Sequence, residues 1–481
     1  SVLLVTPLRA GAEPYQNYIY DSRLSPRAEP QAYIFDRTIT GADMGIGSLK
    51  EPGDVFVADD NGVYIADTGN NRIVHLDENY KLLRVFSQFE NHGKTDTFNA
   101  PAGIFVTPQG DLLVADTGNA RVVRLSGGLD LVRIYEKPES RLITDEFKYE
   151  PVRVAVDAAG RIFIVSKNVN MGIIMLDAQG EFVSFLGAVK TTPDLSQVLW
   201  KLIATKEQKE RMALTLPTEY SSIDIDRSNF VYGTVSAIDP DKAVPGMFIT
   251  RLNPTGVDVL KRNGFYPPTG DAEIRTDPTT FKAQYSQLND VAAREYGIYS
   301  VMDNRMGRIF TYSENGDLLY TFGGLGPNRG QFGRPEAIDV QHDETYLVAD
   351  SVYGWIAVFK PTEYGTLITR AVQLYNQREY DKAGALWAKA FEYTANSDLI
   401  INHVARNMAK EGKNEEAMRY FSYTNDRTRF SDAFVNFRAE IAGRYIDWII
   451  GGVMLLIVFA AVRPFFGKRR KRRQEKDDSH A

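Results

Sequence analysis

The sequence contains no cysteine among its 481 residues. This absence excludes a disulfide framework, a thiolate zinc site and a cysteine nucleophile. It leaves the compartment open, because a large domain outside the cell can be stable without disulfides. The chain also lacks a Gly-x-Ser-x-Gly motif and a phosphate-binding Gly-x4-Gly-Lys-Ser/Thr loop. The sequence signatures of serine hydrolases and of P-loop nucleotide hydrolases are therefore missing.

Positive charge is scarce outside the C-terminal end of the chain. The 56 Lys and Arg residues and the 62 Asp and Glu residues give a net charge of −6. Eight of the basic residues and three of the acidic ones lie from Arg463 onward, which leaves 48 against 59, or −11, for the rest. Phosphate binding depends on accumulated positive charge, so a body this acidic is a poor nucleic-acid binder. We expect no nucleic-acid partner.

One long hydrophobic run lies near the C-terminus. Trp448–Val462 contains no charged residue, and with its flanks the run covers the 22 residues 445–466, close to the ~20 that cross a bilayer core. Six consecutive basic residues, Lys468–Arg473, follow it. The positive-inside rule then places the tail, residues 467–481, in the cytoplasm and the rest of the chain outside. The pattern predicts a single-pass membrane protein rather than a buried core helix beside a solvated charge run.

The N-terminal residues are consistent with this topology. Residues 1–12 read SVLLVTPLRAGA, which is apolar at its start and ends in Ala10-Gly11-Ala12. Small residues in an A-x-A pattern are typical of a signal-peptide cleavage site. We interpret residues 1–12 as the remnant of a signal peptide and expect the domain that follows to be extracellular.

A fixed 15-residue spacing recurs along the chain. Pro52 precedes Asp67 by 15 residues, and the same spacing relates three further pairs: Pro101 and Asp116, Pro151 and Ser166, Pro335 and Asp350. Each interval contains two short apolar runs separated by a turn, and two more such runs follow it. Apolar and β-branched runs bounded by Gly, Asn and Asp are strand and hairpin signals. The spacing therefore marks a repeated unit of four strands.

Four strands in about 40–50 residues are typical of a β-propeller blade. Six copies start near these residues: Pro52, Pro101, Pro151, Pro217, Leu288 and Pro335. The segment Pro30–Thr40 reads as one further strand that completes the last blade and closes the ring, which removes exposed strand edges. The predicted fold is mainly β, a six-bladed propeller over residues 30–360.

Three segments carry a specific resemblance. YIADTGNNRIVHL (64–76), LVADTGNARVVRL (113–125) and GLGPNRGQFGRPEAIDV (324–340) resemble the NHL-repeat family of six-bladed propellers. The resemblance covers roughly residues 30–360 and implies that family's fold.

The Ala-Asp-Thr-Gly-Asn cassette in two of these segments has the composition of an active site or of a turn. Its Asp is followed five residues later by Arg in three copies: Asp67 and Arg72, Asp116 and Arg121, Asp303 and Arg308. A carboxylate and a guanidinium at the two ends of a turn can form a bidentate pair, and we expect Gly69 and Gly118 to supply a positive φ. An active site occurs once per domain, whereas a folding device recurs, so we interpret these six as structural turn pairs. The pattern breaks at Ser166 and Trp355, whose loops we expect to be free for another use.

Two families of propeller enzymes offer alternatives. Lactone hydrolases of the gluconolactonase type hold a divalent cation such as Ca²⁺ with Glu, Asn and Asp at the channel mouth, but spacing alone selects no trio here. Amidating lyases with an NHL-type propeller use three His on zinc and are held by disulfides. This propeller has only His75, His92 and His342 and no cysteine. We predict no catalytic residue and no cofactor, a divalent cation entering only under the hydrolase alternative.

Two regions outside the blades have helical periodicity. The segment Asp194–Met212 has four apolar residues at helical spacing: Val198, Leu199, Leu202 and Ile203. We expect a helix there that either packs on the propeller or docks a partner. After Lys360 the period changes to 3.6 over residues 362–443.

In that second region a small residue precedes a bulky aromatic by four positions, twice. Ala383 and Trp387 recur 34 residues later as Ala417 and Phe421, with Ala390 one turn after Trp387. Helix pairs of period 34 resemble tetratricopeptide (TPR) repeats. Two units are fewer than the three usually needed for a stable stack, so the segment is either a rigid stalk or a platform for another protein.

These features together predict a membrane-anchored extracytoplasmic binding or scaffold protein. Its propeller and stalk would present a surface to a protein or carbohydrate partner. Similar propeller–stalk–anchor proteins occur near sugar-import ABC transporters in Gram-positive bacteria, so the resemblance implies an accessory role beside such a transporter. The alternative is a metal-dependent, gluconolactonase-like surface hydrolase.

Overall fold

The computed structural model describes residues 17–143, 147–169, 171–187, 219–235, 248–264, 266–271, 275–276, 283–284 and 286–477. The predicted signal remnant (1–12) and the predicted helical insertion (194–212) lie outside the described residues. The chain divides into two compact units, Ser1–Leu399 and Ile400–Ala481. The first unit extends beyond residue 360, the predicted end of the propeller, because one helix packs onto the blades and a second helix packs on the first.

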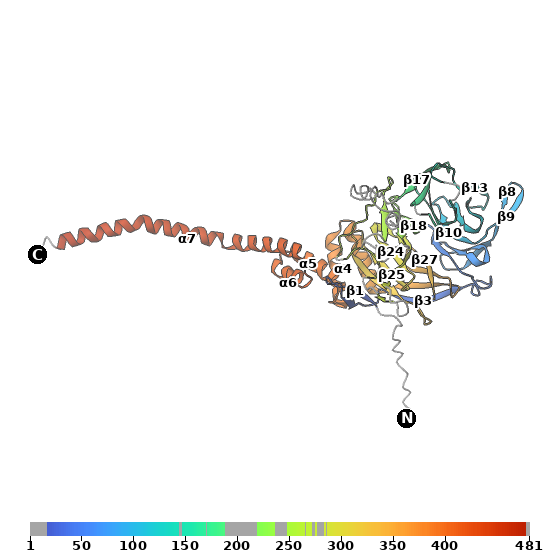
Figure 1. The fold of residues 1–481 in the computed structure, drawn as a ribbon. Helices are drawn as coiled ribbons and strands as arrows, with labels where there is room; N and C mark the ends of the chain where they lie inside the picture. The colour runs from blue at the N-terminus through green and yellow to red at the C-terminus, as the bar shows by residue number, and fades with distance from the viewer. Residues whose placement is uncertain are drawn as a thin grey trace, which may run out of the picture. The chain divides into compact units, whose positions relative to one another are not determined.

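Six antiparallel sheets form the predicted six-bladed propeller, which is confirmed (Figure 1). The first three blades are β4 (Asp54–Val57), β5 (Val63–Asp67), β6 (Arg72–Leu76) and β7 (Leu82–Phe86); β10 (Pro101–Val106), β11 (Leu112–Asp116), β12 (Arg121–Leu125) and β13 (Leu131–Tyr135); and β14 (Pro151–Val156), β15 (Ile162–Ser166), β16 (Ile173–Leu176) and β17 (Phe182–Leu186). The other three are β18 (Tyr220–Ile225), β19 (Val231–Val235) and β20 (Ile249–Leu252); β23 (Leu288–Ala293), β24 (Tyr299–Asp303), β25 (Arg308–Tyr312) and β26 (Leu318–Gly323); and β27 (Pro335–Val340), β28 (Tyr346–Asp350), β29 (Trp355–Pro361) and β3 (Tyr33–Thr40).

The 15-residue spacing is the register of the first two strands of a blade. Pro101 lies opposite Asp116, Pro151 opposite Ser166, and Pro335 opposite Asp350. In blade 4 the opposed residues are Tyr220 and Val235, so the equivalent position falls three residues after Pro217. The spacing is therefore a reliable guide to the blades even where proline is replaced.

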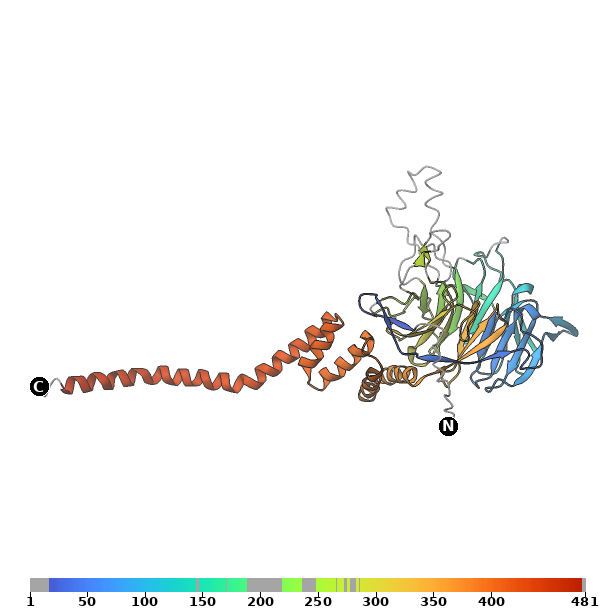
Figure 2. The same cartoon turned by 90° about the horizontal axis from the view of Figure 1, so that it is seen from below.

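The ring closes through a strand from the start of the chain. β3 pairs with β29 from Trp355 opposite Thr40 to Pro361 opposite Tyr33, and the two strands lie side by side in blue and orange in Figure 2. The innermost strands β4, β10, β14, β18, β23 and β27 neighbour one another in sequence, and β27 returns to β4. The predicted closure is confirmed, and it removes the open strand edges of an unclosed sheet.

Three small hairpins add to the blades. They are β1 (Tyr18–Tyr20) with β2 (Pro26–Ala28), β8 (Gln88–Asn91) with β9 (Lys94–Thr97), and β21 (Arg275–Thr276) with β22 (Ala283–Gln284). The β1–β2 hairpin packs against β26, where Thr321 Oγ1 donates to the Tyr18 carbonyl at 2.9 Å. It also contacts the start of the third C-terminal helix, because the Ser22 N–H donates to Asp398 Oδ2 at 2.8 Å.

Five helices follow the propeller: α3 (Glu363–Asn376), α4 (Tyr380–Tyr393), α5 (Asp398–Lys410), α6 (Asn414–Tyr423) and α7 (Arg427–Asp477). The Thr362 side chain caps α3 by accepting from the Gly365 N–H. α3 packs on blades 5 and 6, where Thr369 Oγ1 lies 3.0 Å from the Tyr320 hydroxyl. Helices α3 and α4 are thus part of the propeller unit.

The second unit consists of most of α5, with α6 and α7. Ala405, Ala417, Phe421 and Ala433 form its buried core. Thr424 Oγ1 donates to Asn402 Oδ1 at 2.6 Å within this core, so the polar groups at the end of α6 are paired rather than buried alone.

Candidate functional site

The centre of the ring is lined by two positions of each innermost strand. The first position is occupied around the ring by Asp54, Gly103, Arg153, Ser222, Asp290 and Ala337, and the second by Phe56, Phe105, Ala155, Asp224, Ala292 and Asp339. These are the second and fourth residues after the proline or its equivalent, because side chains on one face of a strand alternate. The channel is therefore lined by carboxylates, one guanidinium and two phenylalanines.

Arg153 reaches from blade 3 to three other blades. Its Nη1 donates to the Ala102 carbonyl at 2.8 Å, and its Nη2 lies 3.2 Å from the Gly53 carbonyl and 3.4 Å from that of Glu336. A side chain that bonds to blades 1, 2 and 6 must lie across the middle of the ring. Gly103 lets the innermost strands of blades 2 and 3 approach closely, since a Cβ there would meet the Val152 carbonyl at 2.3 Å.

Two carboxylates flank this guanidinium at longer range. Arg153 Nε lies 3.9 Å from Asp54 Oδ1 and 3.8 Å from Asp290 Oδ1. Ser222 Oγ donates to the same Asp290 oxygen at 2.5 Å. Arg153 thus provides the positive charge between two buried acids, an arrangement that lowers the cost of removing them from water.

Four channel carboxylates join neighbouring blades. Each accepts a backbone N–H from the innermost strand of the next blade, at 2.6–2.8 Å: Asp54 from Ile104, Asp224 from Ala293, Asp290 from Ile338, and Asp339 from Val57. These bonds cover four of the six blade junctions. The acids therefore hold the ring together.

Burial changes the protonation of these acids. Removal from water raises the pKa of Asp54 and of Asp224 to about 7 in each case, partly offset at Asp54 by Arg153. Burial also raises the pKa of Asp290, and it raises that of Asp339 further because Asp224 adds repulsion. Carboxylate oxygens that already accept backbone N–H groups have fewer lone pairs free for a divalent cation.

Metal-ligating residues do not gather elsewhere either. Within the described ranges, no group of three or more His, Asp or Glu side chains is placed to hold a metal ion. His75 stacks on Tyr64 with ring centroids 4.0 Å apart, inside blade 1. The channel chemistry fits a structural role better than it fits the cation of the hydrolase alternative.

Two of the three predicted turn pairs form ion pairs. Arg72 Nε donates to Asp67 Oδ2 at 2.6 Å, and Arg121 Nε donates to Asp116 Oδ2 at 2.8 Å. The pairing is single rather than bidentate, because the other guanidinium nitrogens turn to Ile46 or to Asp96. Both acids are fully buried.

These acids also tie the turn to the chain that enters the blade. Asp67 Oδ1 accepts the Lys50 N–H and Asp116 Oδ1 accepts the Asn99 N–H, each at 2.7 Å. The third predicted pair is different, since no ion pair joins Asp303 and Arg308, although the two lie opposite each other in the strand register. The Arg308 guanidinium instead lies over the Tyr18 ring, 4.4 Å from its centroid.

The glycines of the cassette are needed because there is no room for a side chain, not because their φ is positive. The positive φ falls two residues later, at Asn71 (54°) and Ala120 (51°), so the prediction for Gly69 and Gly118 was wrong. A Cβ on Gly69 would lie 2.8 Å from the Lys50 carbonyl, and one on Gly118 would lie 2.7 Å from that of Asn99. Glycine is needed because the entering chain passes too close for a side chain.

The two positions where the cassette pattern breaks are structural. Ser166 is buried, and its Oγ accepts the Glu150 N–H at 2.8 Å, which reproduces the role of the missing aspartate. In blade 6 Asp350 accepts the Gly333 and Arg334 N–H groups. Trp355 packs against Tyr353 with ring centroids 4.6 Å apart, so an aromatic contact replaces the ion pair.

The residues predicted to pack the helical segment are buried. Ala383, Trp387 and Ala390 lie on α4, Ala417 and Phe421 lie on α6, and none is more than 2% exposed. α4 begins at Tyr380 and α6 at Asn414, 34 residues later. The two sets belong to different compact units.

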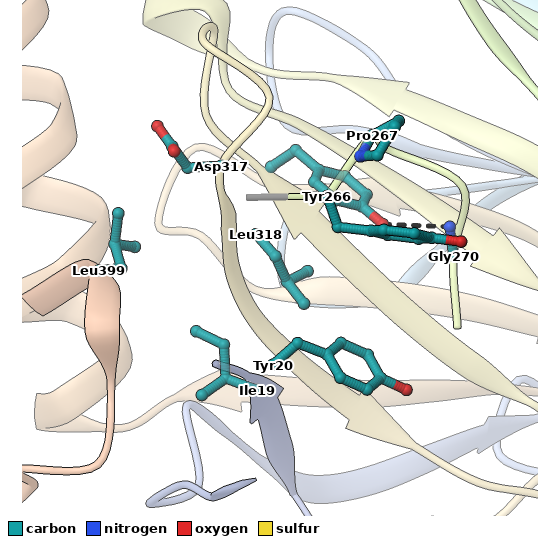
Figure 3. A pocket seen from close by; sticks show the side chains of 9 residues that line it. Ile19, Tyr20, Tyr266, Pro267, Gly270, Asp317, Leu318 and Leu399 are labelled. Carbon is teal, nitrogen blue, oxygen red and sulfur yellow. Dashed lines mark hydrogen bonds between the residues drawn. The ribbon is translucent and has the colours of Figure 1, made fainter. Parts of the chain in front are cut away.

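One cleft opens beside the β1–β2 hairpin (Figure 3). Its lining includes Tyr20, Tyr312 and Leu399, and the Gly270 N–H donates to the Tyr312 hydroxyl at 3.1 Å. The cavity volume is about 30 Å³, room for one or two water molecules. The cleft is too small for a metabolite.

Sequence reasoning missed the channel residues, although the signal was present. The 15-residue spacing already located the first residue of each innermost strand, and alternation places the second and fourth residues on its inner face. Asp54, Arg153 and Asp290 occupy the same position in blades 1, 3 and 5. Their bonds depend on which blades become neighbours, and that follows only from ring closure.

Comparison with known proteins bears on the repeat and on the fold. Residues 98–125 match the NHL repeat model, which agrees with the resemblance seen in the sequence, and no curated protein matches the chain. Similar solved structures include selenomethionine-substituted virginiamycin B lyase from Staphylococcus aureus, at 13% identity and a TM-score of 0.42, covering 66% of this chain and 97% of that one.

A streptogramin B lyase structure is similar at 13% identity and a TM-score of 0.39, covering 65% of this chain and 94% of that one. A catalytically inactive virginiamycin B lyase from Staphylococcus aureus with quinupristin is similar at 14% identity and a TM-score of 0.38, covering 64% and 80%. Likeness at this level says nothing about the activity of this chain.

Proposed function

We propose that this chain is a membrane-anchored binding and scaffold protein whose propeller and TPR-like helices lie outside the cytoplasm. The observation that carries the proposal is the state of the channel. Its carboxylates accept inter-blade N–H groups and Arg153 lies across its centre. Because the inner side chains of this propeller are already paired, its outer surface rather than its channel is available to bind a partner.

The anchor in this proposal is α7. Arg427–Arg463 is long and apolar enough to cross a bilayer, with a mean hydropathy of 2.2 over its most apolar window. Trp448 is 80% exposed and Leu455 72%, as expected for side chains that face lipid. The basic run after residue 466 supports a cytoplasmic C-terminus.

The outer strands of blades 1, 2 and 3 offer a surface for a protein partner. Leu83, Val132 and Val183 are 56%, 51% and 50% exposed, and each is the second residue of its outer strand. Carbohydrate sites usually use an exposed aromatic platform. In the described part of the propeller Tyr296 is the single strongly exposed aromatic, so a protein partner is favoured, such as a subunit of a sugar-import ABC transporter.

The test is purification of the full chain from membranes in mild detergent. We expect a protein to co-purify at fixed stoichiometry with the natural chain and to be lost with Leu83→Glu. The matched control is Leu142→Glu, because Leu142 is 59% exposed and lies on no outer strand. A chain without a partner that hydrolyses lactones with added Ca²⁺, and loses this activity in Asp339→Asn, would instead support the hydrolase.

A further inference from the structure

The segment that precedes the first blade connects two parts of the propeller unit. We call residues 17–32 the strap; it contains the β1–β2 hairpin and ends where β3 begins. On blade 5, Thr321 Oγ1 donates to the Tyr18 carbonyl of the strap at 2.9 Å. At the other end of the strap, the Ala32 carbonyl accepts the Thr362 N–H at 2.9 Å, at the start of α3. The strap therefore joins the outer edge of blade 5 to the first helix after the propeller.

The hairpin of the strap buries few apolar side chains. All three residues of β2 are exposed, whereas Ile19 and Tyr20 of β1 are buried. These two side chains line the cleft shown in Figure 3, together with Leu318 of blade 5. Elements with few buried apolar contacts open locally at a lower free energy than the core of a domain. The hairpin is therefore an element that can detach while the blades stay folded.

A buried carboxyl contacts α3 from the end of this hairpin. Glu29 Oε1 accepts from the Tyr364 hydroxyl at 2.6 Å, and Glu29 Oε2 is buried without a hydrogen-bond partner. In the described part of the chain Tyr364 is the only titratable group that acts on this carboxyl. Behind it lies Tyr393 of α4, with the two tyrosine ring centroids 5.8 Å apart. A buried carboxylate with one hydroxyl partner and no cation is costly, so this contact favours the protonated acid.

Blade 5 contains an alternative partner for a second contact of the strap. The Arg308 guanidinium lies over the Tyr18 ring, 4.4 Å from its centroid. Arg308 also lies opposite the buried Asp303 in the strand register. In blade 1 the residues in the same register, Arg72 and Asp67, form an ion pair. If Tyr18 moved away, Arg308 could therefore form with Asp303 the pair that blade 1 already has.

We propose that the strap is a pH-dependent lid on blade 5, which is attached while Glu29 is protonated and detaches when Glu29 ionises, as Arg308 passes from Tyr18 to Asp303. Detachment would uncover the cleft and the strand β26, and the outer edge of blade 5 would then be exposed as it is in blades 1–3. The proposal is independent of the membrane anchoring proposed above.

The direction of the pH dependence follows from the two environments of Glu29. In the attached strap burial raises its pKa from 4.5 to about 8, whereas in the detached strap the carboxyl is in water. The attached form is therefore fully favoured below pH 4.5, and this preference is lost as the pH rises toward 8. Between pH 5.5 and 7.5 the ratio of detached to attached strap should rise by up to about 100-fold.

The absence of cysteine makes the detachment measurable by thiol labelling of the full chain. Ile19→Cys places a thiol where the side chain is 3% exposed, and Leu24→Cys places one on the same hairpin where it is 41% exposed. Both variants are labelled with N-ethylmaleimide at pH 5.5 and 7.5. The ratio of the Ile19→Cys rate to the Leu24→Cys rate corrects for the pH dependence of thiol reactivity. We expect this labelling ratio to rise by about tenfold or more.

Three control variants connect this rise to the strap and to Glu29. Glu29→Gln cannot ionise, so it should keep the labelling ratio nearly constant, whereas the exposed Glu181→Gln should leave the rise unchanged. Val114→Cys, buried in blade 2, should stay unlabelled at both pH values. Thr321→Cys reports the uncovering of β26 from the blade side and should repeat the result if Ile19→Cys itself loosens the strap.

The contrary outcomes are equally defined. A labelling ratio that does not change with pH, or that rises equally in Glu29→Gln, would overturn the proposal. Labelling of Val114→Cys with the same pH dependence would also overturn it, because the whole propeller would then be opening. Asp303→Asn should lower the ratio several-fold at pH 7.5, since Arg308 loses its alternative partner, and an unchanged ratio would overturn the exchange of Arg308.

Discussion

The outer strands of blade 5 and of blades 1–3 have opposite environments at the same position. The second residue of the outer strand is Leu319 in blade 5 and Leu83 in blade 1, and the registers of the two strands are equivalent. Leu319 is 0% exposed, whereas Leu83 is 56% exposed. β1 and α3 cover blade 5, and nothing in the described residues covers Leu83 in the same way.

This contrast defines two sides of the propeller. The covered side consists of the outer strands of blades 5 and 6 with β1, β2 and α3, and the open side consists of the outer strands of blades 1–3. On the covered side β1, β2 and α3, which precede and follow the propeller in the chain, bury a blade edge. Charged groups are buried together with that edge. Substitutions there should cost stability, whereas substitutions on the open side should affect binding alone.

The largest effect is expected at Arg294. This buried side chain pairs with Glu344 and donates to the Tyr320 and Tyr346 hydroxyls at 2.8 and 2.9 Å. Arg294→Met would leave these partners unsatisfied and should lower the free energy of unfolding by about 3–5 kcal/mol. The open-side control Arg84→Met, at an exposed position, should change it by less than about 0.5 kcal/mol. Denaturant unfolding of the full chain in detergent measures both, and equal losses would remove the distinction between the two sides.

The matched leucines give the next largest difference. Leu319→Ala creates a cavity in a filled core and should cost about 2–5 kcal/mol. Leu83→Ala removes a side chain that is already in water and should cost less than about 0.5 kcal/mol. The comparison uses the same unfolding measurement. A cost at Leu83 that approached the cost at Leu319 would mean that another part of the chain covers the open side.

Much of this fold could be predicted from the sequence. The 15-residue spacing and the turn residues between apolar runs are local signals, and they located the starts of all six blades and the strand that closes the sixth. Blade 4 begins at Tyr220 rather than at Pro217 because the register, not the proline itself, is what recurs. Local patterns were sufficient for the blades because every blade repeats the same strand register and turn residues.

The covered side could not be predicted, because its contacts are not local and do not repeat. β1 and β2 have three residues each and no alternation that distinguishes them from a loop. Their contacts are with residues more than 250 positions away, such as Asp271 and Asp398. Arg308 was predicted to pair with Asp303 by its spacing, but the Tyr18 ring from this hairpin takes its place. Long-range contacts of this kind occur once and leave no repeat.

A pH-dependent difference follows from Glu29. Its carboxyl is buried and accepts from the Tyr364 hydroxyl at 2.6 Å, and burial raises its pKa from 4.5 to about 8. The folded state therefore binds a proton that the unfolded state releases. The stability from this group is complete below pH 4.5 and is lost as the pH rises toward 8.

Glu29→Gln should remove this dependence, because the amide is neutral at every pH. Between pH 5.5 and 7.5 one group changes the free energy of unfolding by at most about 2.7 kcal/mol. We expect the advantage of the variant over the natural chain to grow between pH 5.5 and pH 7.5, by up to this amount. Glu181→Gln is the open-side control at an exposed position, and a similar gain there would show that burial is not the cause.

A smaller effect is expected at Tyr18. Its hydroxyl donates to Asp271 Oδ2 at 2.6 Å while its ring lies below the Arg308 guanidinium. Tyr18→Phe removes only the hydroxyl and should cost about 1 kcal/mol. Tyr18→Leu also removes the cation–π contact and should cost about 0.5–1 kcal/mol more. If the two variants unfold at the same denaturant concentration, the contact between the Tyr18 ring and Arg308 contributes nothing to the stability of the covered side.

The smallest effect on stability and the clearest effect on binding are expected together on the open side. Val132→Ser and Val183→Ser replace half-exposed side chains and should each change the free energy of unfolding by less than about 0.5 kcal/mol. If a protein partner covers these strands, each serine removes apolar area from the contact, and the two losses should add because the residues lie on different blades. Titration of the purified partner measures this. Unchanged affinity in the double variant would move the binding surface away from the open side.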